Sequence, residues 1–149
     1  RKAVPDLAIT TDIIVGFPNE TEEDFLETID LVQKVQFDNA FSFIYSKRAG
    51  TPAARMQDDV SLEEKKERLQ RLNDVLGYYA KAINETYVHQ VIEILVEGVS
   101  KNNANMLSGK TASNKTVIFA GDAALVGQFV LVEITEAQTW ILKGVLLEP

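Results

Sequence analysis

The stretch AITTDIIVGFPNET, residues 8–21, decides the fold of the first half of this chain. It begins with β-branched residues and becomes almost continuously apolar toward Gly16, which is typical of a parallel strand buried on both faces. A turn is predicted over residues 16–19. Thr21 with Asp24 resembles a capping box in which Asp replaces the usual Glu or Gln. A helix is therefore expected over residues 22–36.

A second strand is predicted over residues 40–45, which completes a strand–helix–strand unit with parallel strands. Residues 46–60 read as a loop, and Ser61 with Glu64 forms another capping box that opens a long helix ending near residue 86. The apolar stripe predicted for this helix consists of Leu62, Leu69, Leu72, Val75, Leu76, Tyr79, Ile83 and Tyr87.

The pattern changes after Tyr87, where short apolar runs alternate with Gly, Asn, Asp and Ser. Five strands are predicted, over residues 91–97, 106–111, 116–119, 129–134 and 140–146. Five short strands in such a length indicate a small, OB-like, antiparallel β-barrel. We therefore predict an α/β domain over residues 1–86 and an all-β domain over residues 87–149.

Composition narrows the possible functions. The chain of 149 residues has no cysteine and one histidine, His89, so Cys-ligated metal sites and disulfides are excluded. The net charge is −7 and residues 89–149 carry 4 basic and 6 acidic side chains, so a strong phosphate-binding surface is not expected. No apolar run reaches the roughly 18 residues of a membrane span. Without a signal sequence, a cytosolic protein with no membrane partner is expected.

Two polar turns follow the two predicted parallel strands. Ligands of parallel sheets gather at the carboxyl ends of the strands, where Gly16 allows close backbone approach and Pro18 stiffens the turn. Tyr45 to Pro52 adds hydroxyls and the Arg48 guanidinium, which could bind a carboxylate, ribose or phosphate. An ordinary turn and a solvated loop would show the same features. The acidic residues Glu20, Glu22, Glu23 and Asp24 are interpreted as favourable charge at a helix N-terminus rather than as metal ligands.

Four segments resemble the MiaB-type tRNA methylthiotransferases of the radical-SAM family. Residues 11–21 are similar to that family's TDIIVGFPGET segment, with Asn19 where Gly is usual, and residues 43–54 to FxYSxRxGTPAA. Residues 107–115 resemble the LSGRTxxNK run of its TRAM domain, with Lys110 for Arg, and residues 134–144 resemble ITEAxxWxLxG. The resemblance implies the terminal βα units of a radical-SAM partial TIM barrel followed by a TRAM barrel.

The resemblance also implies cofactors. The family binds S-adenosylmethionine and two 4Fe–4S clusters, which are held by cysteines absent here, so the chain looks like a C-terminal fragment that binds no cluster and catalyses nothing alone. Its N-terminal domains would be partners, and its oligomeric state is left open. The residues expected at the S-adenosylmethionine site are Gly16, Phe17, Pro18, Glu20, Tyr45, Ser46, Arg48, Gly50 and Thr51.

The resemblance further implies a tRNA substrate, methylthiolated at the isopentenyladenosine beside the anticodon. The residues expected to contact the tRNA anticodon stem-loop are Lys110, Thr111, Ser113, Asn114, Lys115 and Trp140. Trp140 opens an apolar strand, which favours a place in the barrel core over stacking on a base. The two lysines could instead serve solubility alone. A sister activity on a ribosomal-protein aspartate and a stand-alone RNA-binding adaptor are the alternative functions.

Overall fold

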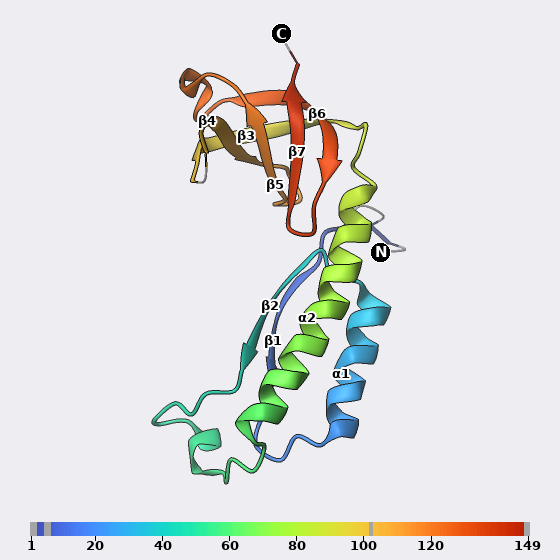
Figure 1. The fold of residues 1–149 in the computed structure, drawn as a ribbon, viewed down its shortest axis with the longest axis vertical. Coiled ribbons are helices and arrows are strands. Elements are labelled where there is room, and N and C mark those ends of the chain that lie inside the picture. The colour runs from blue at the N-terminus through green and yellow to red at the C-terminus, as the bar shows by residue number, and fades with distance from the viewer. Residues whose placement is uncertain (1–2, 5–6, 102, 148–149) are drawn as a thin grey trace. The chain divides into compact units, whose positions relative to one another are not determined.

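The computed structural model describes residues 3–4, 7–101 and 103–147 and divides the chain into two compact units (Figure 1). One unit comprises residues 9–79 and the other joins residues 80–149 with residues 1–8. The division falls inside a long helix rather than at the predicted boundary near Tyr87. Each unit has its own apolar core.

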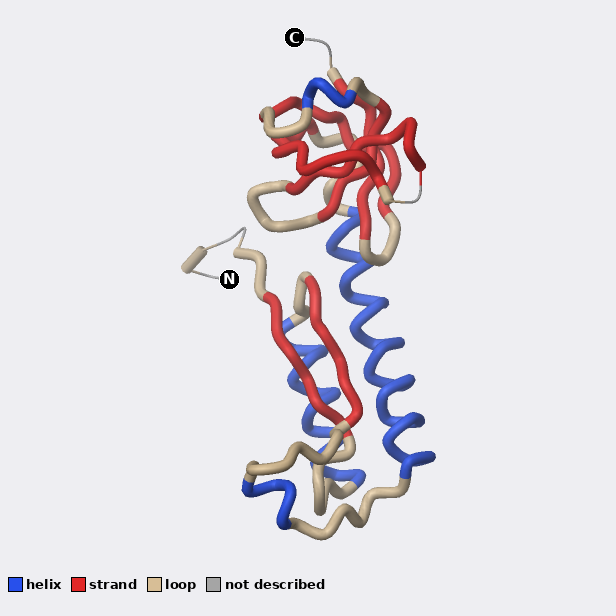
Figure 2. Tube along the Cα trace, turned by 90° about the vertical axis from the view of Figure 1, so that its left-hand side faces the viewer, coloured by secondary structure: helices blue, strands red, loops and turns tan. Residues whose placement is uncertain are grey.

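The first unit contains the predicted strand–helix–strand arrangement. Strand β1 (Thr10–Val15), helix α1 (Glu22–Val35) and strand β2 (Asn39–Ile44) follow in order, and β1 pairs with β2 in parallel from Thr10↔Asn39 to Val15↔Ile44. Figure 2 shows the two strands side by side with α1 behind them. The buried core of this unit consists of residues from β1, from α1, from the segment between α1 and β2, and from the next helix: Val15, Phe25, Val32, Phe37, Leu72 and Leu76.

Both ends of α1 follow from local chemistry. The Thr21 hydroxyl accepts a hydrogen bond from the Asp24 N–H, and the Asp24 carboxylate accepts from the Thr21 N–H at 2.9 Å, so the predicted capping box is confirmed. At the other end Gln36 adopts a left-handed conformation (φ 54°) and its N–H donates to the Val32 carbonyl. These bonds satisfy backbone groups that have no partner inside the helix.

One face of the β1–β2 sheet is open, so the prediction that the first strand is buried on both faces is wrong. Ile14 is 54% exposed and Phe43, its partner in register, is 51% exposed; Phe41 is 63% exposed. Helices cover only the opposite face, because the side chains of a strand alternate between the two sides and only one set enters the core. An apolar run in the sequence does not show whether another layer of the protein covers the second face of the strand.

Helix α2 (Leu62–Glu85) follows a 3₁₀ turn, η1 (Pro52–Arg55), and starts at the predicted Ser61–Glu64 capping box. Its apolar stripe differs from the prediction at the first turns. Leu62 is 58% exposed, whereas Lys65 and Arg68 are 4% and 6% exposed. Both cations have polar partners that offset their burial: Arg68 pairs with Glu20 in the turn after β1, and Lys65 pairs with Asp58 in the segment before α2.

The second unit contains the five-stranded barrel that the sequence predicts. Its strands are β3 (Val91–Ser100), β4 (Asn103–Lys110), β5 (Thr116–Ala120), β6 (Phe129–Ala137) and β7 (Ile141–Leu146), with the 3₁₀ turn η2 (Ala123–Leu125) between β5 and β6. They close in the order β3-β4-β5-β7-β6. The pair β5–β7 is parallel, so the expectation of an antiparallel barrel is wrong at this one seam.

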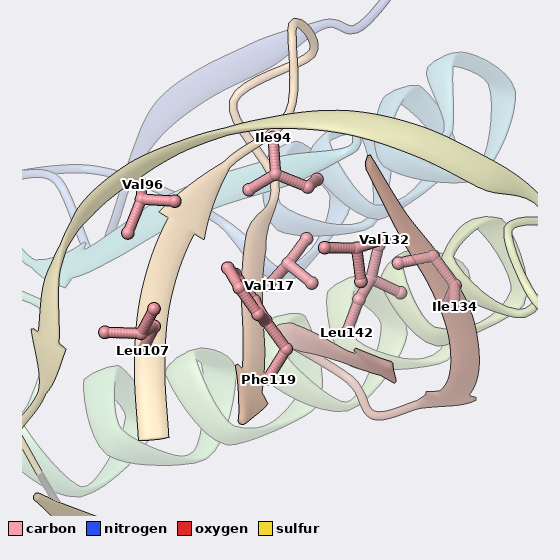
Figure 3. Packing of buried hydrophobic residues seen from close by; sticks show 8 residues of the cluster. All are labelled: Ile94, Val96, Leu107, Val117, Phe119, Val132, Ile134 and Leu142. Carbon is pink, nitrogen blue, oxygen red and sulfur yellow. The ribbon is translucent and has the colours of Figure 1, made fainter. Parts of the chain in front are cut away.

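Eight buried side chains fill the barrel and point toward one another in Figure 3: Ile94, Val96, Leu107, Val117, Phe119, Val132, Ile134 and Leu142. Two glycines let the strands approach closely around them. A Cβ on Gly109 would lie 2.6 Å from the Leu95 carbonyl oxygen, and one on Gly144 would lie 2.5 Å from the Glu133 carbonyl oxygen. No other residue fits these positions without a shift of the backbone.

Candidate functional site

The turn after β1 is shaped by two residues in the left-handed region. Gly16 and Asn19 both have a φ of 68°. Asn accepts the left-handed conformation better than most residues, so Asn19 can occupy the position where the similar family motif has Gly. The Gly16 N–H donates to Glu20 Oε1 at 2.9 Å, and the Glu20 N–H donates to the Phe17 carbonyl at 2.9 Å. Gly16 and Pro18 are buried, whereas the Phe17 side chain is 41% exposed.

Glu20 faces inward and is held by α2. Arg68 Nη1 donates to Glu20 Oε1 at 2.8 Å and to the Glu20 carbonyl oxygen at 3.0 Å. The Arg68 side chain is 7% exposed and that of Glu20 is 11% exposed. The predicted cofactor-binding carboxylate therefore has an internal function, which is to fix the backbone of the turn through the Gly16 N–H.

Tyr45, at the end of β2, lies against this turn. Its ring packs edge-on to Phe17 with centroids 5.1 Å apart, and its N–H donates to the Val15 carbonyl at 2.8 Å. Lys65 Nζ lies 5.3 Å from the Tyr45 ring centroid. The Tyr45 hydroxyl oxygen is buried and has no hydrogen-bond partner among the described residues. A buried polar atom without a partner is costly, so it is a candidate contact for a ligand.

The other predicted cofactor residues lie on the loop that follows β2. Ser46, Arg48 and Gly50 are exposed, and Gly50 has a φ of 87° with open space around it. The Thr51 hydroxyl donates to the Arg48 carbonyl at 2.8 Å and accepts from the Ala54 N–H at 3.2 Å, so it caps η1. The structure brings together the turn and Tyr45, while this loop presents the Arg48 guanidinium to solvent.

Three of the acidic residues near the start of α1 have polar partners: Glu20 pairs with Arg68, Glu22 with Arg71, and Asp24 with Thr21. A hydrogen bond from Arg71 at 2.7 Å lowers the pKa of Glu22, and the hydrogen bonds from Thr21 lower that of Asp24. Within the part of the chain that the structure describes, no group of three or more acidic or histidine side chains is placed to hold a metal ion. Glu22, Glu23 and Asp24 lie in the first turn of α1, where negative charge is favourable.

One end of the barrel carries the predicted RNA-binding residues. The parallel register pairs Thr116 with Ile141, and the antiparallel register pairs Lys110 with Thr116. The β4–β5 turn and the β6–β7 turn therefore lie at the same end. The Asn84 side chain donates to the carbonyls of Gln138 and Thr139, at 2.8 Å and 3.1 Å, and so holds the β6–β7 turn.

The β4–β5 turn is built around an internal hydroxyl network. Thr111 and Ser113 share a hydrogen bond of 2.9 Å, and Ser113 is 3.2 Å from the Tyr87 hydroxyl. The Lys115 N–H donates to the Thr111 hydroxyl, and Lys115 Nζ lies 5.6 Å from the Tyr87 ring centroid. Thr111 and Lys115 are only 6% and 8% exposed, so the prediction that they meet RNA at the surface is corrected. They support the turn from within.

Of the predicted RNA-binding residues at this barrel end, Asn114 and Trp140 are exposed, and Lys110 and Ser113 are half-buried. Lys110 is half-buried and donates to the Thr116 hydroxyl at 2.9 Å, and Asn114 is exposed with φ 61°. Trp140 is 52% exposed and precedes β7, which begins at Ile141. The favoured core position for Trp140 is therefore wrong, because the indole lies in the turn before the apolar strand.

Sequence reasoning missed Lys65, Arg68, Asn84 and Tyr87 as residues that organise these two regions. The sequence does contain a signal for Lys65 and Arg68. Lys65 and Arg68 occupy positions that share a helix face with Leu69, Leu72 and Leu76, where the periodicity predicts apolar side chains. A charged residue at such a position indicates a buried partner.

Comparison with known proteins gives two findings. The family described as the TRAM domain matches residues 85–147. The chain is 54% identical over 144 residues to the tRNA-2-methylthio-N(6)-dimethylallyladenosine synthase of Acetivibrio thermocellus, covering 97% of this chain and 30% of that protein. The synthases of Bacillus cytotoxicus and Bacillus mycoides are 53% and 55% identical over 148 residues. The chain spans about three tenths of the length of these relatives.

Proposed function

We propose that this chain, which is a homologue of the tRNA-2-methylthio-N(6)-dimethylallyladenosine synthases and carries a TRAM domain over residues 85–147, forms part of such a transferase. The observation that carries the proposal is identity above half over nearly the whole chain, across both structural units. The relatives' names specify tRNA, which favours a tRNA substrate over the ribosomal-protein alternative. The substrate would be the dimethylallyl-modified adenosine, also called isopentenyladenosine, in the anticodon stem-loop.

The first unit would supply the terminal βα units of a partial radical-SAM barrel. In a barrel of βα units the helices lie outside and the inner strand faces line the interior. The open face of β1–β2 supports this arrangement, because its exposed residues Ile14, Phe41 and Phe43 are apolar and lie opposite the helix-covered face. The missing barrel wall would come from the rest of the transferase.

The turn and Tyr45 fit an S-adenosylmethionine site. The unpartnered Tyr45 hydroxyl can exchange a hydrogen bond with a polar group of the cofactor, and the exposed Phe17 ring offers an apolar surface. The Arg48 guanidinium can bind a carboxylate. S-adenosylmethionine, when bound, supplies the reactive sulfonium group of the family's chemistry. The residues of this chain would bind and orient it.

The iron–sulfur clusters do not fit this chain. Clusters of this type are held by cysteine thiolates, and the chain has no cysteine. Cluster ligands would have to come from other domains of the transferase. We therefore expect that the chain alone binds no cluster and has no methylthiotransferase activity.

The barrel end with the β4–β5 and β6–β7 turns is proposed as the RNA-contacting surface. Lys110 supplies a charge for a phosphate, Asn114 supplies hydrogen-bond donors, and the exposed Trp140 ring can stack on a base. The outward face of β3 and β6 is less suitable, since Glu93 and Glu133 place negative charge there. Thr111, Ser113 and Lys115 would hold the turn in its RNA-contacting shape.

Salt-dependent binding of an anticodon stem-loop RNA to the full-length transferase tests this surface. Lys110→Ala should reduce the slope of log K against log salt by about 0.7–0.9, which corresponds to the loss of one phosphate contact. Trp140→Ala should weaken binding by about 1–3 kcal/mol. Lys101→Ala is the matched control, because this exposed lysine lies beyond the far end of β4. Slopes and affinities that are equal for all three variants would place the RNA surface elsewhere.

A further inference from the structure

The turn after β1 is held in place from a distant part of the chain. The segment before α2 and the first turns of α2 provide every long-range polar contact that the structure records to this turn. Asp59 Oδ1 accepts a hydrogen bond from the Asn19 N–H at 2.7 Å. Arg68 donates to the carboxylate and to the carbonyl of Glu20. The conformation of the turn therefore depends on residues that follow it by about 40–50 positions.

Arg68 acts on the turn through Glu20. Glu20 Oε1 accepts hydrogen bonds from both the Arg68 guanidinium and the Gly16 N–H, at 2.8 Å and 2.9 Å. This carboxylate thus joins the helix to the backbone of the turn. Without the guanidinium, a carboxylate that is 11% exposed would lose its charge partner and would turn toward water. The Gly16 N–H would then lose its acceptor.

Lys65 acts on the turn and on Tyr45 by packing. A Cβ on Gly16 would lie 2.3 Å from Lys65 Cγ, so the lysine stem fills the space beside the glycine. Lys65 Nζ donates to both carboxylate oxygens of Asp58, at 2.5 Å and 2.7 Å, and lies 5.3 Å from the Tyr45 ring centroid. The lysine is therefore fixed at its charged end and in contact with the turn along its stem.

We propose that Arg68 and Lys65 of α2 are positioning residues for the cofactor-binding turn: they fix the backbone at Gly16 and the ring of Tyr45 and are not themselves contacts of the cofactor. The inference rests on the proposed function, in which this turn lines the S-adenosylmethionine site. A binding site that is correctly shaped for only part of the time binds more weakly in proportion to that fraction. Positioning residues should thus affect cofactor affinity without touching the cofactor.

Arg71 provides the matched control on the same helix. Arg71 Nη2 pairs with Oε1 of Glu22, the first residue of α1, at 2.7 Å, and the Arg71 side chain is 38% exposed. This pair lies at the start of α1 rather than in the turn. Arg71→Gln therefore removes an ion pair between α2 and α1 and leaves the contacts of Gly16 unchanged.

The first measurement uses the 149-residue chain and follows amide hydrogen exchange by NMR. Arg68→Gln should speed hydrogen exchange of the Gly16 amide about tenfold or more, because this factor corresponds to the loss of roughly one charge-assisted hydrogen bond. Arg71→Gln should leave this amide unchanged. Arg68→Lys keeps the charge and should restore part of the protection. Unchanged exchange at Gly16 in a folded Arg68→Gln protein would overturn the proposal.

The second measurement is the dissociation constant of S-adenosylmethionine for the full-length transferase. Arg68→Gln and Lys65→Met should raise it about tenfold, while the affinity for stem-loop RNA stays within about twofold. If Arg68→Gln raises the dissociation constant no more than Arg71→Gln does, the positioning role is refuted. This holds even if the contact variants Arg48→Ala and Tyr45→Phe weaken cofactor binding. If those two contact variants also bind normally, the cofactor site itself has been misplaced.

Discussion

Replacing Gly144 with alanine should specifically destabilise the barrel. The added methyl would lie 2.4 Å from Val132 Cγ1 and 2.5 Å from the Glu133 carbonyl oxygen. The valine could adjust, but it is 0% exposed, and the carbonyl belongs to the neighbouring strand, so β6 and β7 must separate locally. Overpacking of this kind costs about 1–3 kcal/mol, and reduced freedom of the unfolded chain returns less than 1 kcal/mol.

A net loss of about 2 kcal/mol should lower the melting temperature of a unit of this size by about 10 °C. Fluorescence of Trp140, the only tryptophan, reports on the barrel selectively. Gly98→Ala is the matched control, because a Cβ there has nothing within 4 Å. Melting temperatures of the two variants within about 2 °C of each other would contradict the steric argument.

Three further predictions concern the first unit and the cofactors. Tyr45→Phe should raise the free energy of unfolding by about 1 kcal/mol in urea titrations, because the buried hydroxyl has no hydrogen-bond partner among the described residues; a decrease would reveal a partner. The Ser61 hydrogen bonds lower the pKa of Glu64 from 4.5, so stability should be complete above that pH and fall as pH drops through the lowered pKa. Ser61→Ala should flatten this acid titration. Anaerobic reconstitution of the chain with iron and sulfide should give no cluster absorption band.

Local chemistry in the sequence predicted the elements of the first unit well. The capping boxes at Thr21 and Ser61 placed the start of each helix at the observed residue. The parallel pairing of β1 with β2 followed from the intervening helix. Features of this kind depend on residues close in sequence, and the sequence displays them directly.

The remaining features depend on contacts that are distant in sequence. The parallel pairing of β5 with β7 could not be predicted in this way, because no α-helix lies between the two strands in the sequence. Burial of Lys115 requires the Tyr87 ring, and burial of Arg68 requires Glu20. Trp140 has apolar successors, yet it lies one residue before the strand, and strand ends are poorly defined by periodicity.

The order of strands in the barrel also has a kinetic consequence. β3 pairs with β6, joining Val91 to Glu133, and β5 pairs with β7, joining Thr116 to Ile141. Each pairing closes a long loop, and the chain must lose the conformational entropy of that loop before the hydrogen bonds between the two strands form. Chains dominated by such non-local pairings fold in about milliseconds to seconds, slower than helical bundles of similar size. The helices of the first unit should therefore form well before the barrel closes.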